Sequence, residues 1–237
     1  MAEESKGAVL AAMAANFAIA AGKLAAGLLT GSAAMLAEAG HSIADTVNQV
    51  FLLVGINLSS ADPDEVHPYG YGKEAFFWSF LAAIFIFVAG AAFSVFEGVR
   101  TLFQDENHER SGSQLAIAFG VLAMAFLFES ISFGIAVRGL LRGARAKAWS
   151  LARYLRESPD LTIKTVFFED SAALLGLAAA LIGIGAAQYF DIPELDGVAS
   201  ICIAGILAAT AALLARETKG LLIGEAADPA VTRKLLQ

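Results

Sequence analysis

Strongly polar side chains interrupt one long apolar stretch of this sequence at regular intervals. Residues 33–57 are mostly apolar, yet they contain Glu38, His41, Asp45, Asn48 and Gln49 at steps of three and four. Because an α-helix repeats every 3.6 residues, this spacing places all five on one face. His41 and Asp45, at i and i+4, direct an imidazole and a carboxylate toward a shared point, which suits two ligands of one cation. The alternative is a structural polar seam between helices, although such seams more often use Ser, Thr or Asn.

Carboxylates also interrupt two later apolar stretches. Glu169 and Asp170 are adjacent, and neighbouring residues on a helix point roughly 100° apart, so one site need not receive both. We expect one to be a direct ligand and the other a second acceptor or a proton carrier. Glu129, beside Ser130, is either a further ligand or a hydrogen-bonding group between helices. The candidate metal ligands are His41, Asp45, Glu169 and Asp170, with Asn48 and Glu129 as secondary candidates.

The other ionisable residues near apolar stretches have simpler explanations. Lys23 and Glu38 are equally far from the turn at residues 30–32, so antiparallel helices would bring them to the same depth as a structural ion pair. His67 and His108 fall in loops; His67, with acidic residues nearby, is either part of a weak surface metal site or simply solvated. A single cysteine, Cys202, cannot form an internal disulfide, and we expect it to be a buried packing residue.

The elements that must position these residues are long apolar helices. The 237-residue chain is 57% hydrophobic and 16% charged, whereas a soluble domain is roughly 25% charged. A hydrocarbon core about 30 Å thick requires about 20 mostly apolar residues per helix. Six such spans are predicted, at residues 8–29, 33–57, 75–102, 114–137, 165–189 and 197–214. Abundant alanine and glycine let these helices approach closely. We therefore predict an all-α membrane protein, a compact bundle of six transmembrane helices.

The distribution of basic residues predicts the orientation of this bundle. The connection between the fourth and fifth spans, residues 138–164 with a predicted break over 138–159, carries seven of the 16 basic residues: Arg138, Arg142, Arg145, Lys147, Arg153, Arg156 and Lys164. The positive-inside rule makes this connection cytoplasmic, and six spans then place both termini there too. Residues 1–224 form the predicted transmembrane domain, and residues 225–237 a short cytoplasmic tail. A formal net charge of −7 leaves no basic surplus for nucleic acid.

Carboxylates gathered in a low-dielectric pocket must hold either a cation or protons. A divalent metal displaces protons from its ligands, and protons displace the metal at lower pH. Alternating exposure of such a site would couple metal efflux to inward proton flow, with an imidazole that titrates near neutral pH. Nitrogen and oxygen ligands without thiolate suit Zn²⁺, with Fe²⁺, Mn²⁺ or Co²⁺ as alternatives. The sequence has neither HExxH nor GxSxG, so we do not expect an enzyme.

Several long segments resemble the cation diffusion facilitator family of metal/proton antiporters. They are residues 30–49, 67–74 and 76–79, while residues 169–173 and 196–197 are similar to the branch that includes animal mitochondrial zinc transporters. The resemblance covers about residues 8–224. It implies a six-helix membrane domain, homodimers, and a transport site on the second and fifth helices. We expect a multi-pass protein of the cytoplasmic (inner) cell membrane, with an organelle as the alternative that this branch suggests.

Carried over by residue, the resemblance places the HxxxD pair on His41 and Asp45 and the fifth-helix aspartate on Asp170. The family's ligand four residues earlier is here Val166, which cannot coordinate a metal, so Glu169, Asn48, Glu129 or water must complete the site. Family members commonly continue into a cytoplasmic domain, which residues 225–237 could only begin. The predicted function is proton-coupled export of divalent cations, Zn²⁺ first, by alternating access. The alternative is a non-transporting membrane subunit whose polar seam is structural.

Overall fold

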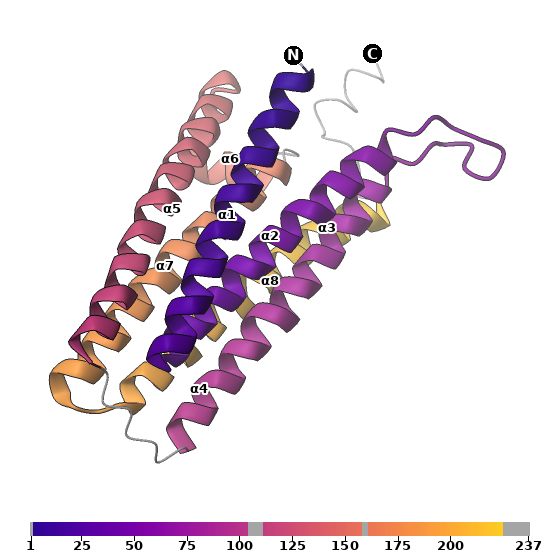
Figure 1. Cartoon of the computed structure of the whole chain (residues 1–237). Helices are drawn as coiled ribbons and strands as arrows, with labels where there is room; N and C mark the ends of the chain where they lie inside the picture. The colour runs from indigo at the N-terminus through magenta and orange to yellow at the C-terminus, as the bar shows by residue number, and fades with distance from the viewer. Residues whose placement is uncertain (1, 104–110, 158–160, 225–237) are drawn as a thin grey trace.

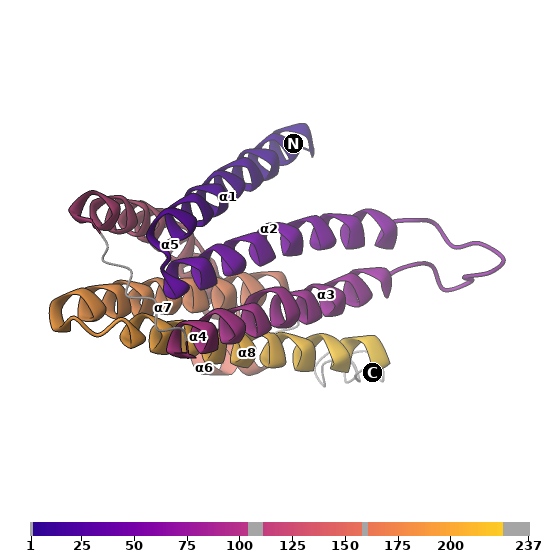
Figure 2. The same cartoon turned by 60° about the horizontal axis from the view of Figure 1, so that its bottom comes forward.

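The computed structural model describes residues 2–103, 111–157 and 161–224, and the regular structure in these ranges is entirely helical. The helices are α1 (Ala2–Thr30), α2 (Ala33–Ser59), α3 (Glu74–Phe85), the π-helix η1 (Ile86–Ala92), α4 (Phe93–Phe103), α5 (Gly112–Ala146), α6 (Leu151–Glu157), α7 (Leu161–Phe190) and α8 (Glu194–Ile223). They form an elongated bundle in which α1 begins and α8 ends toward the same end (Figures 1 and 2). The predicted all-α fold is confirmed for the described residues.

Each predicted span corresponds to one long helical stretch, with α3, η1 and α4 together forming the third. Several boundaries were wrong: α1 begins at Ala2 and α7 at Leu161, and the largest differences are that α5 continues to Ala146 and α8 to Ile223. Arg138, Arg142 and Arg145 therefore lie on α5 and not in a break between helices. Hydropathy marks where a helix leaves an apolar environment, whereas the Ala, Leu and Arg residues beyond that point still favour helix.

Within the described residues, four helical stretches are long and apolar enough to cross a membrane. They cover Glu74–Phe103, Gly112–Ala146, Lys164–Phe190 and Glu194–Ile223. In α1 the apolar portion identified is the shorter Asn16–Thr30, and α2 carries the polar face that lowers its hydropathy. The chain is therefore a multi-pass membrane protein, whereas spanning by α1 and α2 and the orientation of the bundle stay predictions.

Helix α2 is the central element of the bundle. It contacts α1, α3, η1, α4, α7 and α8, and its first half is almost continuously buried. Small residues make this possible: a Cβ at Gly40 would lie 3.0 Å from the ring of Phe93 and 3.4 Å from the carbonyl oxygen of Ala89. The third span can therefore approach α2 beside His41.

The turn between α1 and α2 fixes the start of the central helix. Gly31 has φ +62°, a left-handed conformation that glycine adopts without strain. Ser32 then caps α2, because its hydroxyl accepts a hydrogen bond from the backbone N–H of Met35 at 3.1 Å. At the same end of the bundle, Gln114 in the first turn of α5 donates to the carbonyl of Leu29 at 2.8 Å. These contacts set the depth of α2 relative to α1 and α5.

Some sequence predictions fall outside the described residues or need correction. His108, Arg110 and residues 225–237, including the predicted tail, lie outside the part of the chain that the structure describes. Cys202 was predicted to be buried but is exposed on α8. In a membrane-spanning helix the outward face is as apolar as the inward one, so an apolar run does not reveal which face a residue occupies.

Candidate metal centre

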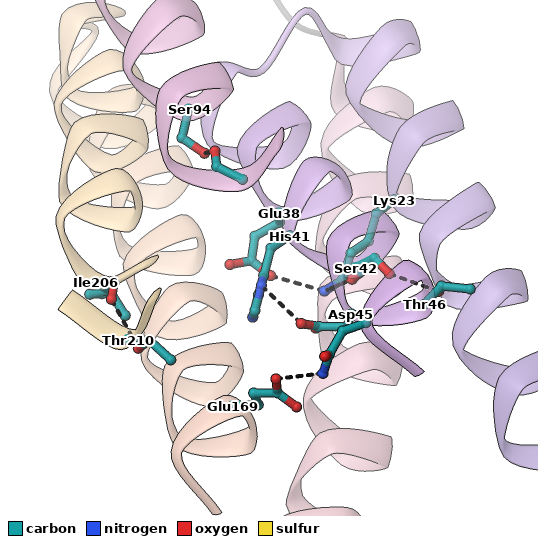
Figure 3. A network of polar contacts seen from close by, with 12 residues as sticks. Lys23, Glu38, His41, Ser42, Asp45, Thr46, Ser94, Glu169, Ile206 and Thr210 are labelled. Carbon is teal, nitrogen blue, oxygen red and sulfur yellow. Dashed lines mark hydrogen bonds and ion pairs between the residues drawn. The ribbon is translucent and has the colours of Figure 1, made fainter. Parts of the chain in front are cut away.

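The polar face of α2 lies in the interior of the bundle, as predicted. His41 and Asn48 are each 2% exposed, and the side chain of Asp45 is 18% exposed. Nδ1 of His41 lies 3.4 Å from Oδ1 of Asp45 across one helical turn. Figure 3 shows the imidazole pointing toward the Asp45 carboxylate, with Glu169 of α7 close to the same group.

The central polar atoms of this face lack hydrogen-bond partners. Among the described residues, nothing hydrogen-bonds to either ring nitrogen of His41 or to Oδ1 of Asp45, and Oε1 of Gln49 is equally unpartnered. Buried polar atoms are nearly always satisfied in folded proteins, because an unmade hydrogen bond in a low-dielectric interior is unfavourable by about 1–3 kcal/mol. His41 and Asp45 therefore present an acceptor set that suits a bound cation.

The two adjacent carboxylates of α7 face different helices. Asn48 on α2 donates to Oε1 of Glu169 at 2.5 Å, whereas Ser132 on α5 donates to Oδ2 of Asp170 at 2.8 Å. This divergence follows from the 100° step between neighbouring helical residues. Glu169 thus faces the polar side of α2, and Asp170 faces α5.

The carboxylates nevertheless share one electrostatic environment. Asp45 interacts at a distance with Glu169, Glu129 and Asp170. No group of three His, Cys, Asp or Glu residues within the described ranges is gathered closely enough to hold an ion. The structure therefore brings His41 and Asp45 together and places Glu169, Asp170 and Glu129 around them without forming a complete coordination shell.

The predicted ion pair between α1 and α2 is confirmed. Nζ of Lys23 lies 2.9 Å from Oε2 of Glu38, and both side chains are fully buried. The same ammonium donates to the hydroxyl of Ser42 at 2.8 Å. Lys23, Glu38 and Ser42 form a compact polar cluster, hereafter the Lys23 cluster, next to His41 (Figure 3).

His67 lies in the exposed loop between α2 and α3. Its imidazole Nδ1 is 3.5 Å from Oδ1 of Asp64, and both side chains are about half exposed. Asp64 accepts hydrogen bonds from the Tyr71 hydroxyl at 2.7 Å and from the backbone N–H of His67 at 2.6 Å. These bonds, the one from Tyr71 first, lower the pKa of Asp64. The observed loop matches the solvated alternative, and its carboxylate is occupied by local hydrogen bonds.

Sequence reasoning missed several residues that organise the site. Ser42 shares the α2 face at i+4 from Glu38, and that spacing was the available signal. Gly176 on α7 leaves room for Glu38, because a Cβ there would overlap Oε1 of that carboxylate. Asp196, noted only as part of a resemblance, is fully buried and caps the start of α2. The last two contacts are long-range, so no local pattern indicates them.

Comparison with known proteins bears directly on this arrangement. Residues 9–223 match the model of the cation efflux transmembrane domain, which covers nearly the whole chain. The chain belongs to the cation efflux family. The resemblance to cation diffusion facilitators is thereby confirmed, and the family is one of cation transporters and not of enzymes.

This cation efflux protein is similar to several curated proteins. It is 32% identical over 235 residues to metal tolerance protein C4 of Arabidopsis thaliana, covering 99% of the chain and 50% of that protein. It is 33% identical over 215 residues to the mitochondrial proton-coupled zinc antiporter SLC30A9 of Homo sapiens, covering 91% of the chain and 37% of that protein. Magnetosome protein MamM of Magnetospirillum gryphiswaldense is 28% identical over 170 residues, or 72% of the chain and 48% of that protein. The chain thus spans about half the length, or less, of these relatives.

Proposed function

We propose that this cation efflux protein exports divalent transition-metal ions, Zn²⁺ first, from the cytoplasm in exchange for protons. The observation that carries the proposal is that both ring nitrogens of buried His41 and Oδ1 of partly buried Asp45, on the central helix, have no hydrogen bond among the described residues. A divalent cation between them would satisfy groups that the described residues leave without hydrogen bonds. The human relative is named as a proton-coupled zinc antiporter, which supports the choice of ion and of coupling.

Glu169 is the fifth-span carboxylate best placed to complete the site. Its hydrogen bond to Asn48 already holds it against the α2 face that carries Asp45, whereas Asp170 is turned toward Ser132 of α5. We propose His41, Asp45 and Glu169 as direct ligands. Asp170, Asn48 and Glu129 are then secondary candidates that enter the shell or exchange protons in other conformations.

Proton coupling follows from the charge of the ligands. An ion bound by carboxylates and a neutral imidazole excludes protons from the same atoms, and protons that return favour release of the ion. Exposure of the site to each side in turn converts this competition into exchange.

We propose six spans with both termini cytoplasmic, residues 1–224 as the transmembrane domain, and a homodimer. A cytoplasmic cell membrane is the proposed location, and the mitochondrial relatives make an organelle the alternative.

Transport into liposomes tests this function. Protein reconstituted with a zinc-sensitive dye inside the vesicles should move Zn²⁺ in response to an imposed pH gradient. Asp45→Ala and Glu169→Gln should reduce the flux by about 100-fold or more, as expected for loss of a direct ligand, and Asp170→Asn should reduce it less. The matched control is Glu194→Gln, an exposed carboxylate in the first turn of α8, which should leave flux unchanged. Wild-type flux in Asp45→Ala would overturn the assignment.

The same variants separate transport from the structural alternative. Hydrogen bonds from Asn48 to Glu169 and from Ser132 to Asp170 do join helices, as a polar seam would. A seam alone predicts that His41→Ala lowers thermal stability without altering zinc binding. The transport proposal predicts the reverse, because His41 makes no hydrogen bond with the described residues whose loss would destabilise the fold.

A further inference from the structure

The Lys23 cluster places a fixed positive charge beside the proposed metal ligands. Lys23 is 0% exposed, and two of its three ammonium donors are used by Glu38 and Ser42. Its charge also acts on His41, Asp45 and Glu129. A buried cation so close to a cation-binding site repels the incoming ion unless another charge offsets it. The structure supplies that offset in Glu38.

Glu38 itself borders the metal centre on the side of α7. Its Oε2 is bonded to Lys23, but Oε1 is buried and without a hydrogen bond among the described residues. Oε1 faces Gly176, where a Cβ would overlap it. Gly176 and Glu169 are seven residues apart on α7 and thus share one helical face. Glu38 is therefore a third carboxylate at the α2–α7 contact that carries Asp45 and Glu169.

The charges divide into two balanced sets. Asp45 and Glu169 together carry two negative charges, which match one divalent ion. Glu38 and Lys23 carry one negative and one positive charge and cancel each other at 2.9 Å. Without Lys23, Glu38 would add an unbalanced negative charge to those of the proposed ligands Asp45 and Glu169; without Glu38, a bare ammonium would face the ion.

We propose that Lys23 is an affinity-setting residue of the transport site, which keeps Glu38 out of the charge balance of the bound metal so that the ion is released in each cycle. The inference rests on the proposed function, because it concerns affinity at the same site. A pair that only joined α1 to α2 would have no such effect on affinity. Our proposal predicts that single substitutions of Lys23 and Glu38 change zinc affinity in opposite directions.

The test is a double-mutant cycle of zinc affinity at one fixed pH, with a fluorescent chelator as competitor and purified full chain. Lys23→Met should tighten zinc binding roughly tenfold, and Glu38→Gln should weaken it roughly tenfold. The double variant should return to within about threefold of wild type, since the two charges cancel. Lys147→Met makes the same charge change far from the site, where Lys147 lies over the Trp149 ring, and should leave affinity unchanged.

A purely structural pair would give a different pattern, in which both single variants bind zinc equally or more weakly and the double variant does not recover. That result would overturn the inference. If Lys23→Met does not fold, the comparison of Glu38→Gln with the double variant decides, because only the charge role predicts tighter binding in the double variant. If folded wild-type protein binds no zinc, or Asp45→Ala binds it normally, the proposed function itself fails.

Discussion

Two carboxylates lie along α2, the fully buried Asp196 of α8 and the partly buried Asp45 of α2 itself, and they differ in how completely the fold satisfies them. At the start of the helix, Asp196 from α8 accepts hydrogen bonds from the Ser32 hydroxyl at 2.8 Å, the backbone N–H of Ala33 at 2.8 Å and that of Ala34 at 3.4 Å. In the middle of the helix, Oδ1 of Asp45 has no hydrogen bond within the described part of the chain.

The difference supports a structural role for Asp196 and the binding role that we propose for Asp45. Asp196 lies at a helix N-terminus, where free N–H groups and the helix dipole stabilise a negative charge. Three donors then leave it little capacity for a ligand. Asp45 lies in the middle of a helix whose own N–H groups are already bonded, so its charge must be balanced from elsewhere. We assign Asp196 to joining α8 and α2, and Asp45 to binding.

The largest expected effect on stability is at the satisfied carboxylate. Asp196→Ala leaves the Ser32 hydroxyl and the backbone N–H groups of Ala33 and Ala34 buried without this acceptor, so unfolding should be easier by about 3 kcal/mol. Thermal unfolding in detergent measures this, with the exposed neighbour Glu194→Ala as the control. Asp45→Ala should show no comparable loss. An unchanged melting temperature for Asp196→Ala would contradict the structural role that we assign to Asp196.

A second prediction concerns the space that α7 leaves for Glu38. Gly176→Ala places a methyl group on Oε1 of Glu38, so either the Lys23–Glu38 pair or the α2–α7 contact must shift, at about 1–3 kcal/mol. The control is Gly205→Ala on α8, where nothing lies within 4 Å. Unfolding in detergent again gives the readout. Equal stability of both variants would show that Glu38 has room to move.

A smaller effect is expected where a hydroxyl joins two helices. Ser132→Ala removes the hydrogen bond to Asp170 and should lower the free energy of unfolding by about 0.6 kcal/mol, the average for such bonds between membrane helices. Zinc affinity should stay within about twofold, because Asp170 is only a secondary candidate. Thr210→Val is the control, since that hydroxyl donates to the carbonyl of Ile206 in its own helix at 3.0 Å. A large loss of zinc binding in Ser132→Ala would indicate that Asp170 is a direct ligand.

The smallest expected effect is in the exposed loop, outside the bundle. Because the Tyr71 hydroxyl lowers the pKa of Asp64 from its ordinary value of 3.8, Tyr71→Phe should raise that pKa. A lowered pKa in the folded state stabilises the loop above pH 3.8, and this contribution is lost as the pH falls through the folded value. Because the folded-state pKa of Asp64 is higher in Tyr71→Phe, the variant should lose this stabilising contribution at a higher pH than wild type. Carboxyl NMR signals during titration measure the shift; an unchanged pKa would mean that Tyr71 does not hold Asp64.

The sequence predicted the parts of the site that depend on helical spacing. The polar face of α2, the Lys23–Glu38 pair and the divergence of Glu169 from Asp170 all follow from the 3.6-residue repeat and from antiparallel connection through a short turn. Six long helical stretches follow from segment length and hydropathy. Each of these inferences uses only residues that are near in sequence or related by one short turn.

The remaining features depend on which distant residues meet. The contact of Asp196 with residues 32–34 joins helices more than 160 positions apart, and the room for Glu38 depends on Gly176 of another helix. The π-helix at residues 86–92 contains no Pro, so its sequence does not indicate a departure from regular α-helix. The error at Cys202 has the same origin: hydropathy does not distinguish the lipid-facing side of a membrane helix from its packed side.

X-ray absorption spectroscopy of the zinc-loaded protein tests the central claim most directly. The chain has three histidines, so His67→Ala and His108→Ala together leave His41 as the sole imidazole. The account predicts one imidazole nitrogen at about 2.0–2.1 Å with oxygen ligands at about 2.0–2.2 Å, and loss of the imidazole signal when Ala also replaces His41. Bound zinc without an imidazole in the His41-only protein would contradict the assignment of the unpartnered His41–Asp45 pair as the metal centre.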